Sequence, residues 1–200
     1  GGYPSYPGKK QMRWGMIYRS AEIDSLEYCS RRELKNLGIK TLIDLRTPSE
    51  IGRQSPLQKG FNVVHIPLAT GDMEDILQGI REEKIKCDTV YRMVERMNRT
   101  LIDKYTKEYR QIFDILLDKT NYPVVIHCSS GKGRTGIVSA LVLAALGINE
   151  DIIMEDYRLS NDYFNIPRAS KYAYRLPTRS QEAITTLFSA REDFLNAAKD

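Results

Sequence analysis

A cysteine and an arginine six positions apart bracket a glycine-containing loop near the middle of the chain. The loop follows the apolar run 124–126 and precedes an apolar helical segment, and from Cys128 to Arg134 it reads Cys-Ser-Ser-Gly-Lys-Gly-Arg. Backbone amides that converge at a helix N-terminus form a nest for anions. The same field stabilises a thiolate, and a planar guanidinium can hold two oxygens of a phosphoryl group. The spacing therefore predicts a nucleophilic cysteine that reacts with a phosphate ester.

Each residue of this loop has an expected role. Cys128 attacks phosphorus and forms a thiophosphate intermediate that water then hydrolyses, while Arg134 binds the phosphoryl oxygens. The Thr135 hydroxyl is placed to hydrogen-bond the sulfur and help it leave. His127 is expected to support the loop by hydrogen bonding rather than to take the proton of the nucleophile. The expected substrate-binding residues of the nest are Ser129, Ser130, Gly131, Lys132 and Gly133.

Other interpretations of the loop fit less well. Gly131, Gly133 and Gly136 satisfy the dinucleotide-binding pattern G-x-G-x-x-G, but the acidic residues about 20 positions later fall in a helical pattern instead of at a strand end. The Walker A pattern fails because Lys132 is followed by glycine, where serine or threonine is required. A purely structural turn with an incidental cysteine would place Lys132 and Arg134 at a positive helix end without an anion, which is unfavourable.

The leaving group of a phosphate ester needs a proton donor, and the loop after another expected strand, 61–67, carries the candidates. We expect Asp72 to be the general acid, with Asp75 as the alternative. The competing role for Asp72 is to cap the helix that follows. Asp44, at the end of an expected strand and paired with Arg46, is predicted to be a supporting residue of the site.

Short apolar runs alternate with amphipathic segments along the chain, which is typical of a buried parallel sheet flanked by helices. The expected strands are residues 12–19, 40–45, 61–67 and 124–126. The expected helices are residues 26–37, 90–119 (one long helix or two short ones), 135–146, 150–159 and 181–198. We therefore predict an α/β fold with a central, mostly parallel sheet of about four to five strands in a three-layer arrangement.

Size and composition indicate one globular unit. The chain has 200 residues, of which 42% are apolar and 28% charged, as in ordinary soluble domains. We expect a flexible lead over residues 1–11 and a single domain over residues 12–200. The net charge of +4 suits anionic substrates but is too small to indicate a nucleic-acid partner. The longest apolar run is shorter than the ~18 residues of a membrane span, so no stable membrane insertion is expected.

The three cysteines are Cys29, Cys87 and Cys128, and no two of them are spaced as C-x-x-C. This count predicts neither a disulfide framework nor a zinc site. Cys29 and Cys87 are expected to be inert, although either could form a protective disulfide with an oxidised Cys128. The chemistry expected of Cys128 uses no metal, so we expect no metal site and no other cofactor.

The loop resembles the active-site loop of the cysteine-dependent protein tyrosine phosphatase superfamily. The resemblance rests on residues 127–136, His-Cys-Ser-Ser-Gly-Lys-Gly-Arg-Thr-Gly. Residues 18–21 (Tyr-Arg-Ser-Ala), 37–50 (ending Asp-Leu-Arg-Thr-Pro-Ser-Glu) and 156–161 (Asp-Tyr-Arg-Leu-Ser-Asn) are similar to the bacterial tyrosine/serine, dual-specificity-like branch. The resemblance implies a phosphatase fold and a phosphomonoester hydrolase that acts on phosphotyrosine in proteins, with dual specificity as an extension.

One departure from the branch leaves alternatives open. Gly133 stands where members of that branch often carry an acid, and the run Lys-Gly-Arg is similar to the loop of phosphoinositide 3-phosphatases. A phosphoinositide or inositol-polyphosphate phosphatase is therefore the first alternative. A non-catalytic phosphate-recognition module and a sulfur-transfer loop of the rhodanese kind are the others. We expect a monomer in the cytoplasm, while the glycine-rich start over residues 1–8 leaves an exported or periplasmic origin open.

Overall fold

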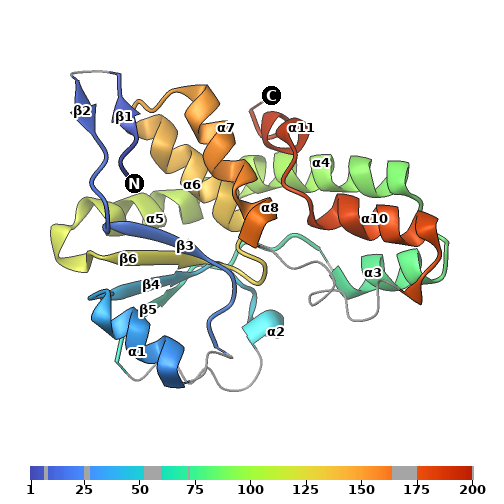
Figure 1. The fold of residues 1–200 in the computed structure, drawn as a ribbon, viewed down its shortest axis with the longest axis horizontal. Helices are drawn as coiled ribbons and strands as arrows, with labels where there is room; N and C mark the ends of the chain where they lie inside the picture. The colour runs from blue at the N-terminus through green and yellow to red at the C-terminus, as the bar shows by residue number, and fades with distance from the viewer. Residues whose placement is uncertain (7–8, 25–27, 52–59, 72, 164–174, 200) are drawn as a thin grey trace.

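The centre of the molecule is a four-stranded parallel sheet in the order β3-β6-β4-β5 (Figure 1). The computed structural model describes the chain except residues 7–8, 25–27, 52–59, 72, 164–174 and 200, and the side chains of residues 28–31. The strands are β3 (Ile17–Ser20), β4 (Thr41–Asp44), β5 (Asn62–His65) and β6 (Val124–His127), preceded by an antiparallel pair, β1 (Pro4–Ser5) and β2 (Lys10–Gln11). The predicted α/β fold with a mostly parallel central sheet is confirmed.

The register of the sheet brings all four carboxyl ends to one edge. His127 of β6 lies opposite Ser20 of β3 and Asp44 of β4, and Asp44 in turn lies opposite His65 of β5. Every residue of β4 and β6 is buried, as central strands of a parallel sheet require. The loop that begins at Cys128 therefore starts among the ends of the other three strands, where open α/β sheets bind their ligands.

Helices cover both faces of the sheet. In the part of the chain that the structure describes, the α-helices are α1 (Tyr28–Asn36), α2 (Pro48–Ile51), α3 (Met73–Arg81), α4 (Cys87–Lys104), α5 (Thr106–Leu117), α6 (Gly133–Ala145), α7 (Glu150–Arg158), α8 (Ser160–Tyr163), α10 (Thr178–Phe188) and α11 (Glu192–Asn196), and only some of them cover the sheet. The larger core cluster joins one face of the sheet to α4, α5, α6 and α7, and a smaller cluster joins the other face to α1. Figure 1 shows the resulting three layers of helix, sheet and helix.

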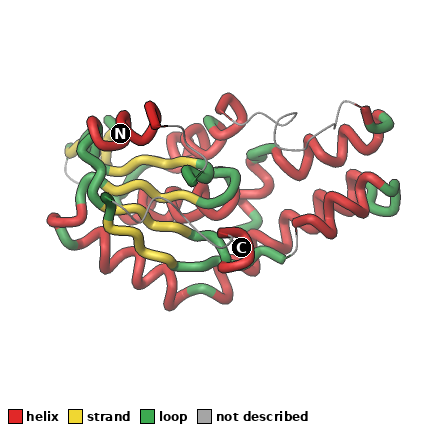
Figure 2. Tube along the Cα trace, turned by 90° about the horizontal axis from the view of Figure 1, so that it is seen from below, coloured by secondary structure: helices red, strands yellow, loops and turns green. Residues whose placement is uncertain are grey.

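A second group of helices extends beyond the sheet (Figure 2). This helical lobe consists of α3, α4, α10 and α11, packed around a separate cluster that includes Ile80, Val90 and Ile184. The continuous helix predicted over residues 181–198 is divided here into α10 and α11. The division has a tertiary cause, because the side-chain amide of Asn161 both donates to and accepts from the backbone of Ala190.

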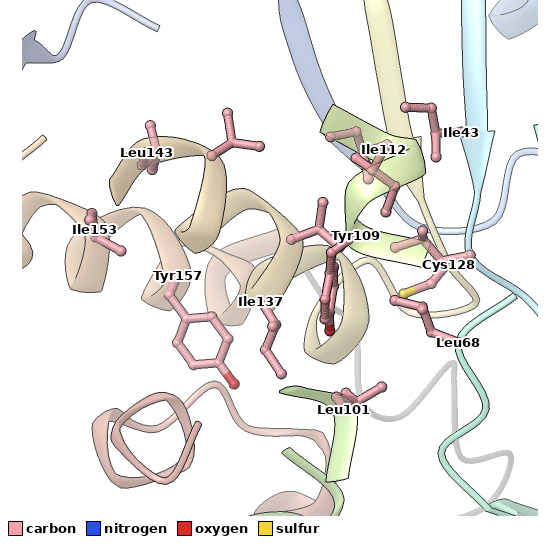
Figure 3. Close-up of a cluster of buried hydrophobic side chains, with 14 of the residues drawn as sticks. Ile43, Leu68, Leu101, Tyr109, Ile112, Cys128, Ile137, Leu143, Ile153 and Tyr157 are labelled. Atoms are coloured by element: carbon pink, nitrogen blue, oxygen red, sulfur yellow. The ribbon is translucent and has the colours of Figure 1, made fainter. Parts of the chain in front are cut away.

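Helix α6 is central to this arrangement and tolerates little added volume. It is largely buried, and Figure 3 shows its Ile137 in the same core cluster as Tyr109 of α5 and Tyr157 of α7. A Cβ added at Gly136 would lie 2.7 Å from two ring carbons of Tyr157, whose side chain is itself buried. The absence of a side chain at Gly136 therefore sets the close approach of α6 and α7.

Replacing Gly136 by alanine is expected to destabilise the protein by about 1–3 kcal/mol, because the buried Tyr157 ring cannot move aside without strain. The matched control is Gly133→Ala on the same helix, where a Cβ meets nothing within 4 Å and we expect a change within about 0.5 kcal/mol. Urea unfolding of both variants measures the difference. Equal stabilities would show that the α6–α7 contact is not close-packed.

Candidate active site

The loop after β6 curls around the sulfur of Cys128. This side chain is 1% exposed, and the backbone amide of Gly131 points to its Sγ at 3.2 Å. Gly131 has φ of +69°, and a Cβ there would lie 2.6 Å from the backbone of Ser20 and Ala21, so only glycine fits. Helix α6 begins directly afterwards, which places its positive end beside the thiol. One loop amide directed at the thiol and a helix N-terminus beside it are features that an anion nest with a cysteine at its base requires.

Arg134 is anchored at the edge of the sheet by several loops. Its guanidinium is buried, and Nη1 donates to the carbonyl oxygens of Leu45 and Leu68 at 3.2 Å each. These carbonyls follow β4 and β5, so the arginine connects the ends of both strands to the start of α6. The two Nη atoms also donate to the two carboxylate oxygens of Glu50, at 2.7 and 2.6 Å.

Glu50 is the partner that sequence reasoning did not single out. Besides Arg134, it accepts hydrogen bonds from the Ser129 hydroxyl at 2.6 Å and from the backbone amide and hydroxyl of Thr47. Burial alone would raise the pKa of Glu50, but these hydrogen bonds outweigh it and lower this pKa from 4.5 to about 2. The sequence signal was a capping box, Thr47 followed by Glu50 three residues later, which by itself indicates only a helix start.

A buried ion cluster supports the loop from beneath. Arg46 is 1% exposed and binds Asp44 at 2.7 Å and Asp24 at 2.6 Å, so the pairing expected between Asp44 and Arg46 is present. Burial opposes ionisation of Asp44, but hydrogen bonds from Arg46 outweigh it and lower the pKa of this carboxyl. The cluster continues to the loop, because the Leu45 amide donates to the carbonyl oxygen of His127.

The His127 ring lies next to Asp44 of this cluster. It is 1% exposed, its Nε2 lies 3.9 Å from Asp44 Oδ2, and its Nδ1 has no hydrogen-bond partner among the described residues. Burial lowers the pKa of His127 below its ordinary 6.5, so the ring is neutral at neutral pH. Its backbone carbonyl accepts from the Leu45 amide at 2.9 Å, which connects His127 to the chain that follows β4.

Lys132 connects the loop to the helical lobe. The ammonium is buried and donates to the carbonyl oxygens of Leu187 at 2.7 Å and Ser189 at 3.1 Å, at the C-terminal end of α10. A lysine is favourable there because the helix end is negative. Burial lowers the pKa of Lys132 from 10.5 to about 8. Two of the three ammonium donors are therefore used within the protein.

Thr135 is fully buried, and in the part of the chain that the structure describes its hydroxyl has no hydrogen-bond partner. A buried hydroxyl is costly to leave unpaired, so this group is available to a transient partner such as the sulfur. Ser129, by contrast, uses its hydroxyl to bind Glu50. Its expected contribution to the nest is thus limited to its backbone.

The acid-bearing loop after β5 is held in place at its base. Leu68 accepts from Arg134, and its own amide donates to the Leu45 carbonyl. The Tyr105 hydroxyl, from the junction of α4 and α5, accepts from the Ala69 amide and donates to the Ala69 carbonyl. Sequence reasoning did not predict this contact of Tyr105, since a tyrosine at helical spacing indicates only core packing.

The two candidate acids belong to this segment. Asp72 lies outside the described residues, and Asp75 is an exposed residue in the first turn of α3. Cys87 of α4 contacts the Thr186 hydroxyl at 3.1 Å and packs in the helical lobe, in a different cluster from Cys128. The side chain of Cys29 lies outside the described residues. Over the described ranges, no set of His, Cys, Asp and Glu could hold a metal ion, and no helix could cross a membrane.

Comparison with known proteins agrees with this geometry. A profile of the tyrosine phosphatase family matches residues 1–200, and the chain belongs to this family. It is 29% identical over 178 residues to the triple specificity protein phosphatase PtpB of Mycobacterium tuberculosis, covering 76% of this chain and 63% of PtpB. It is 28% identical over 158 residues to a putative tyrosine-protein phosphatase of Cupriavidus necator, covering 77% of this chain and 56% of the relative. The superfamily inferred from the loop and the bacterial branch inferred from the flanking motifs are confirmed.

The chain spans roughly half to two thirds of the length of these relatives. A solved structure, that of TpbA from P. aeruginosa, aligns with 93% of this chain and 88% of its own at 16% identity and a TM-score of 0.39. That similarity is too low to support a residue-by-residue comparison.

The ion pair between Glu50 and Arg134 is expected to make the free energy of unfolding depend on pH in the acidic range. Because the pKa of Glu50 is lowered from 4.5 to about 2 in the folded state, its contribution is complete above pH 4.5 and is lost as the pH falls towards 2. Glu50→Gln should therefore cost about 1–2 kcal/mol at pH 7, after discounting for partial exposure, and progressively less between pH 4.5 and pH 2.

Urea unfolding at stepped pH measures this dependence. The matched control is Glu33→Gln on the exposed side of α1, which should leave the pH profile of the wild type unchanged. A constant difference between Glu50→Gln and the wild type over that pH range would show that the ion pair does not stabilise the fold.

Proposed function

We propose that this chain is a phosphomonoester hydrolase, a protein tyrosine phosphatase whose nucleophile is Cys128. The observation that carries the proposal is the Gly131 amide 3.2 Å from Cys128 Sγ, at the start of α6, together with a guanidinium fixed within the same loop. An amide nest and an arginine hold a doubly charged ester in place, and the family of the chain supports the assignment. Residues 12–200 are proposed to form one catalytic domain, and the chain to act as a monomer.

In the first step the sulfur of Cys128 attacks phosphorus in line with the ester oxygen. The S–P bond forms as the P–O bond breaks, and the leaving oxygen takes a proton from a carboxylic acid, for which Asp72 is proposed. The hydrogen bonds of Arg134 to Glu50 leave from the two Nη atoms, so Nε–H is the donor proposed for a phosphoryl oxygen. Amides of the nest bind the remaining oxygens and stabilise the charge of the transition state.

In the second step water attacks phosphorus and the S–P bond breaks. The proton of the water passes to the carboxylate formed in the first step, and sulfur leaves as a thiolate. The buried Thr135 hydroxyl, which has no partner within the described residues, is proposed to donate to that sulfur. Asp44 and His127 are proposed to act through the loop, as positioning residues that keep its first amides in place.

The proposed substrate is a protein that carries phosphotyrosine, with phosphoserine or phosphothreonine as an extension. The relative PtpB is named as a triple specificity protein phosphatase, which supports a broad choice of phosphate ester. The phosphoinositide alternative depended on Lys132. The contacts of that ammonium with α10 add no support to it.

The central test is Cys128→Ser. We expect the purified variant to release no phosphate from p-nitrophenyl phosphate or a phosphotyrosine peptide, because the hydroxyl is far less ionised than the thiol, while thermal unfolding stays close to that of the wild type. Cys87→Ser, in the helical lobe, is the control and should keep full turnover. Phosphate release by the Cys128→Ser variant would end the proposal.

The general acid can be identified from the way kcat of each variant depends on the basicity of the leaving group. Asp72→Asn should lower kcat about 100- to 10,000-fold for aryl phosphates with basic leaving groups and much less for those with acidic ones, because only the former need a proton. Asp75→Asn is the matched control from the same segment. If Asp75→Asn shows this dependence and Asp72→Asn does not, the acid is Asp75.

Lys132→Met separates a role in substrate choice from a role in anchoring the loop. Because its ammonium binds the end of α10, we expect lower stability and a similar fractional loss of kcat/KM for phosphotyrosine peptide and for phosphatidylinositol 3-phosphate. A loss confined to the phosphoinositide would instead assign Lys132 to the binding of a lipid headgroup.

A further inference from the structure

A pocket of about 390 Å³ lies against residues 128–134, here called the phosphate loop, on the side away from the helical lobe. It is bounded by the N-terminal segment, β3, α6, α7 and α8, and Ser130 and Gly131 of the loop form part of its wall. Figure 1 shows β1, β3, α6 and α7 gathered on this side of the molecule. A volume of this size is at the lower end of the range for small-molecule sites.

The walls of this pocket are largely apolar. The side chains that give it this character are Met12, Ile17, Ile126, Val142, Leu143 and Leu159. They come from the N-terminal segment, two strands and two helix regions, so the pocket is a product of the tertiary fold. Apolar walls of this kind favour a ligand that buries hydrocarbon or ring surface.

The charged groups of the pocket already neutralise one another. Arg19 donates through Nη1 to Asp156 Oδ2 at 2.5 Å and through Nη2 to the Ser160 hydroxyl at 2.7 Å. The Tyr3 hydroxyl donates to the other Asp156 oxygen at 2.9 Å. An ionic ligand would have to break this pair, so the pocket favours an uncharged one.

One polar group in the pocket lacks a partner. Ser139, in the middle of α6, is 7% exposed, and its hydroxyl makes no hydrogen bond to any residue that the structure describes. A mid-helix serine commonly bonds the carbonyl four residues earlier, and an unpaired buried hydroxyl costs free energy. The hydroxyl oxygen has almost no accessible surface in this conformation, so a ligand with one hydrogen-bonding group would satisfy it once the side chain turns about χ1 into the pocket.

The pocket and the phosphate loop share wall residues and backbone contacts. Gly131 packs directly on the backbone of Ser20 and Ala21, at the carboxyl end of β3, and all three residues line the pocket. The Glu22 amide also donates to the Ser129 carbonyl at 3.2 Å. An occupant would therefore touch the segment whose amides face the thiol.

We propose that this pocket binds an uncharged, mostly apolar small molecule with a single hydrogen-bonding group held by Ser139, and that its occupancy slows catalysis. The regulatory part rests on the proposed phosphatase function, whereas the binding site does not. Displacing Ser130 and Gly131 would move amides that must point at the phosphoryl group, and such donors act only when they are preorganised.

The probe is N-phenyl-1-naphthylamine, an uncharged ring compound with one N–H, titrated by fluorescence into the full chain. We expect saturable binding at one site that inorganic phosphate does not displace.

Val142→Phe, which fills the pocket, should abolish binding, and Ser139→Ala should weaken it about fivefold. Leu141→Phe, one position away on the same helix and outside the pocket lining, is the matched control and should bind normally. Should Val142→Phe fail to fold, Leu159→Trp at the partly exposed rim blocks the same space.

Binding and activity are measured separately, so the two proposals fail separately. Unsaturable fluorescence, displacement by phosphate, or equal affinity in the wild type and the filled variant would refute the site. With the site established, saturating probe should lower kcat/KM for p-nitrophenyl phosphate severalfold in the wild type and not in Val142→Phe. Turnover unaffected by saturating probe would refute the regulatory role alone. Saturable binding by a protein that releases no phosphate would support the binding site and refute the proposed phosphatase function.

Discussion

The contact on which the rest of the structure depends is the two-pronged ion pair between Arg134 and Glu50. A guanidinium that is 7% exposed would be strongly unfavourable without compensation, because removing a charge from water costs several kcal/mol. Glu50 supplies that compensation with both oxygens, and the carbonyl oxygens of Leu45 and Leu68 supply the rest. The same interaction joins α2, the ends of β4 and β5 and the start of α6. It therefore fixes the phosphate loop to the carboxyl edge of the sheet.

Three further contacts hold the loop: a buried ion cluster, backbone packing against β3 and hydrogen bonds to the end of α10. The buried cluster of Arg46 with Asp44 and Asp24 lies beneath it, and backbone packing of Gly131 on Ser20 holds the β3 side. Lys132 reaches outward to the negative end of α10. Preorganised amides need such rigid support, because a displaced donor stabilises the transition state far less.

These contacts divide the surroundings of the loop into two sides of different character. The side towards the helical lobe is tied by a buried lysine and carries the acid-bearing segment, which Tyr105 holds at Ala69. The opposite side is an apolar pocket with an unpaired serine among the described residues. The proposed catalysis and the proposed binding of a second molecule therefore meet at one loop, because Ser130 and Gly131 belong both to the nest and to the wall of the pocket.

The sequence by itself determined the parts of this protein that are local in the chain. The amide nest, the cysteine and the arginine lie within seven consecutive positions, and the short apolar runs predicted the parallel sheet, because strand burial is recorded in contiguous residues. Helix ends were less well predicted, as the break between α10 and α11 shows, since its cause is the distant Asn161. Only the tertiary structure could pair Arg134 with Glu50, 84 positions away, turn Lys132 towards α10, and place Ser139, unpaired among the described residues, in the wall of a pocket. Side-chain partners across such separations depend on where the sheet register brings chain segments together, and no local pattern records that.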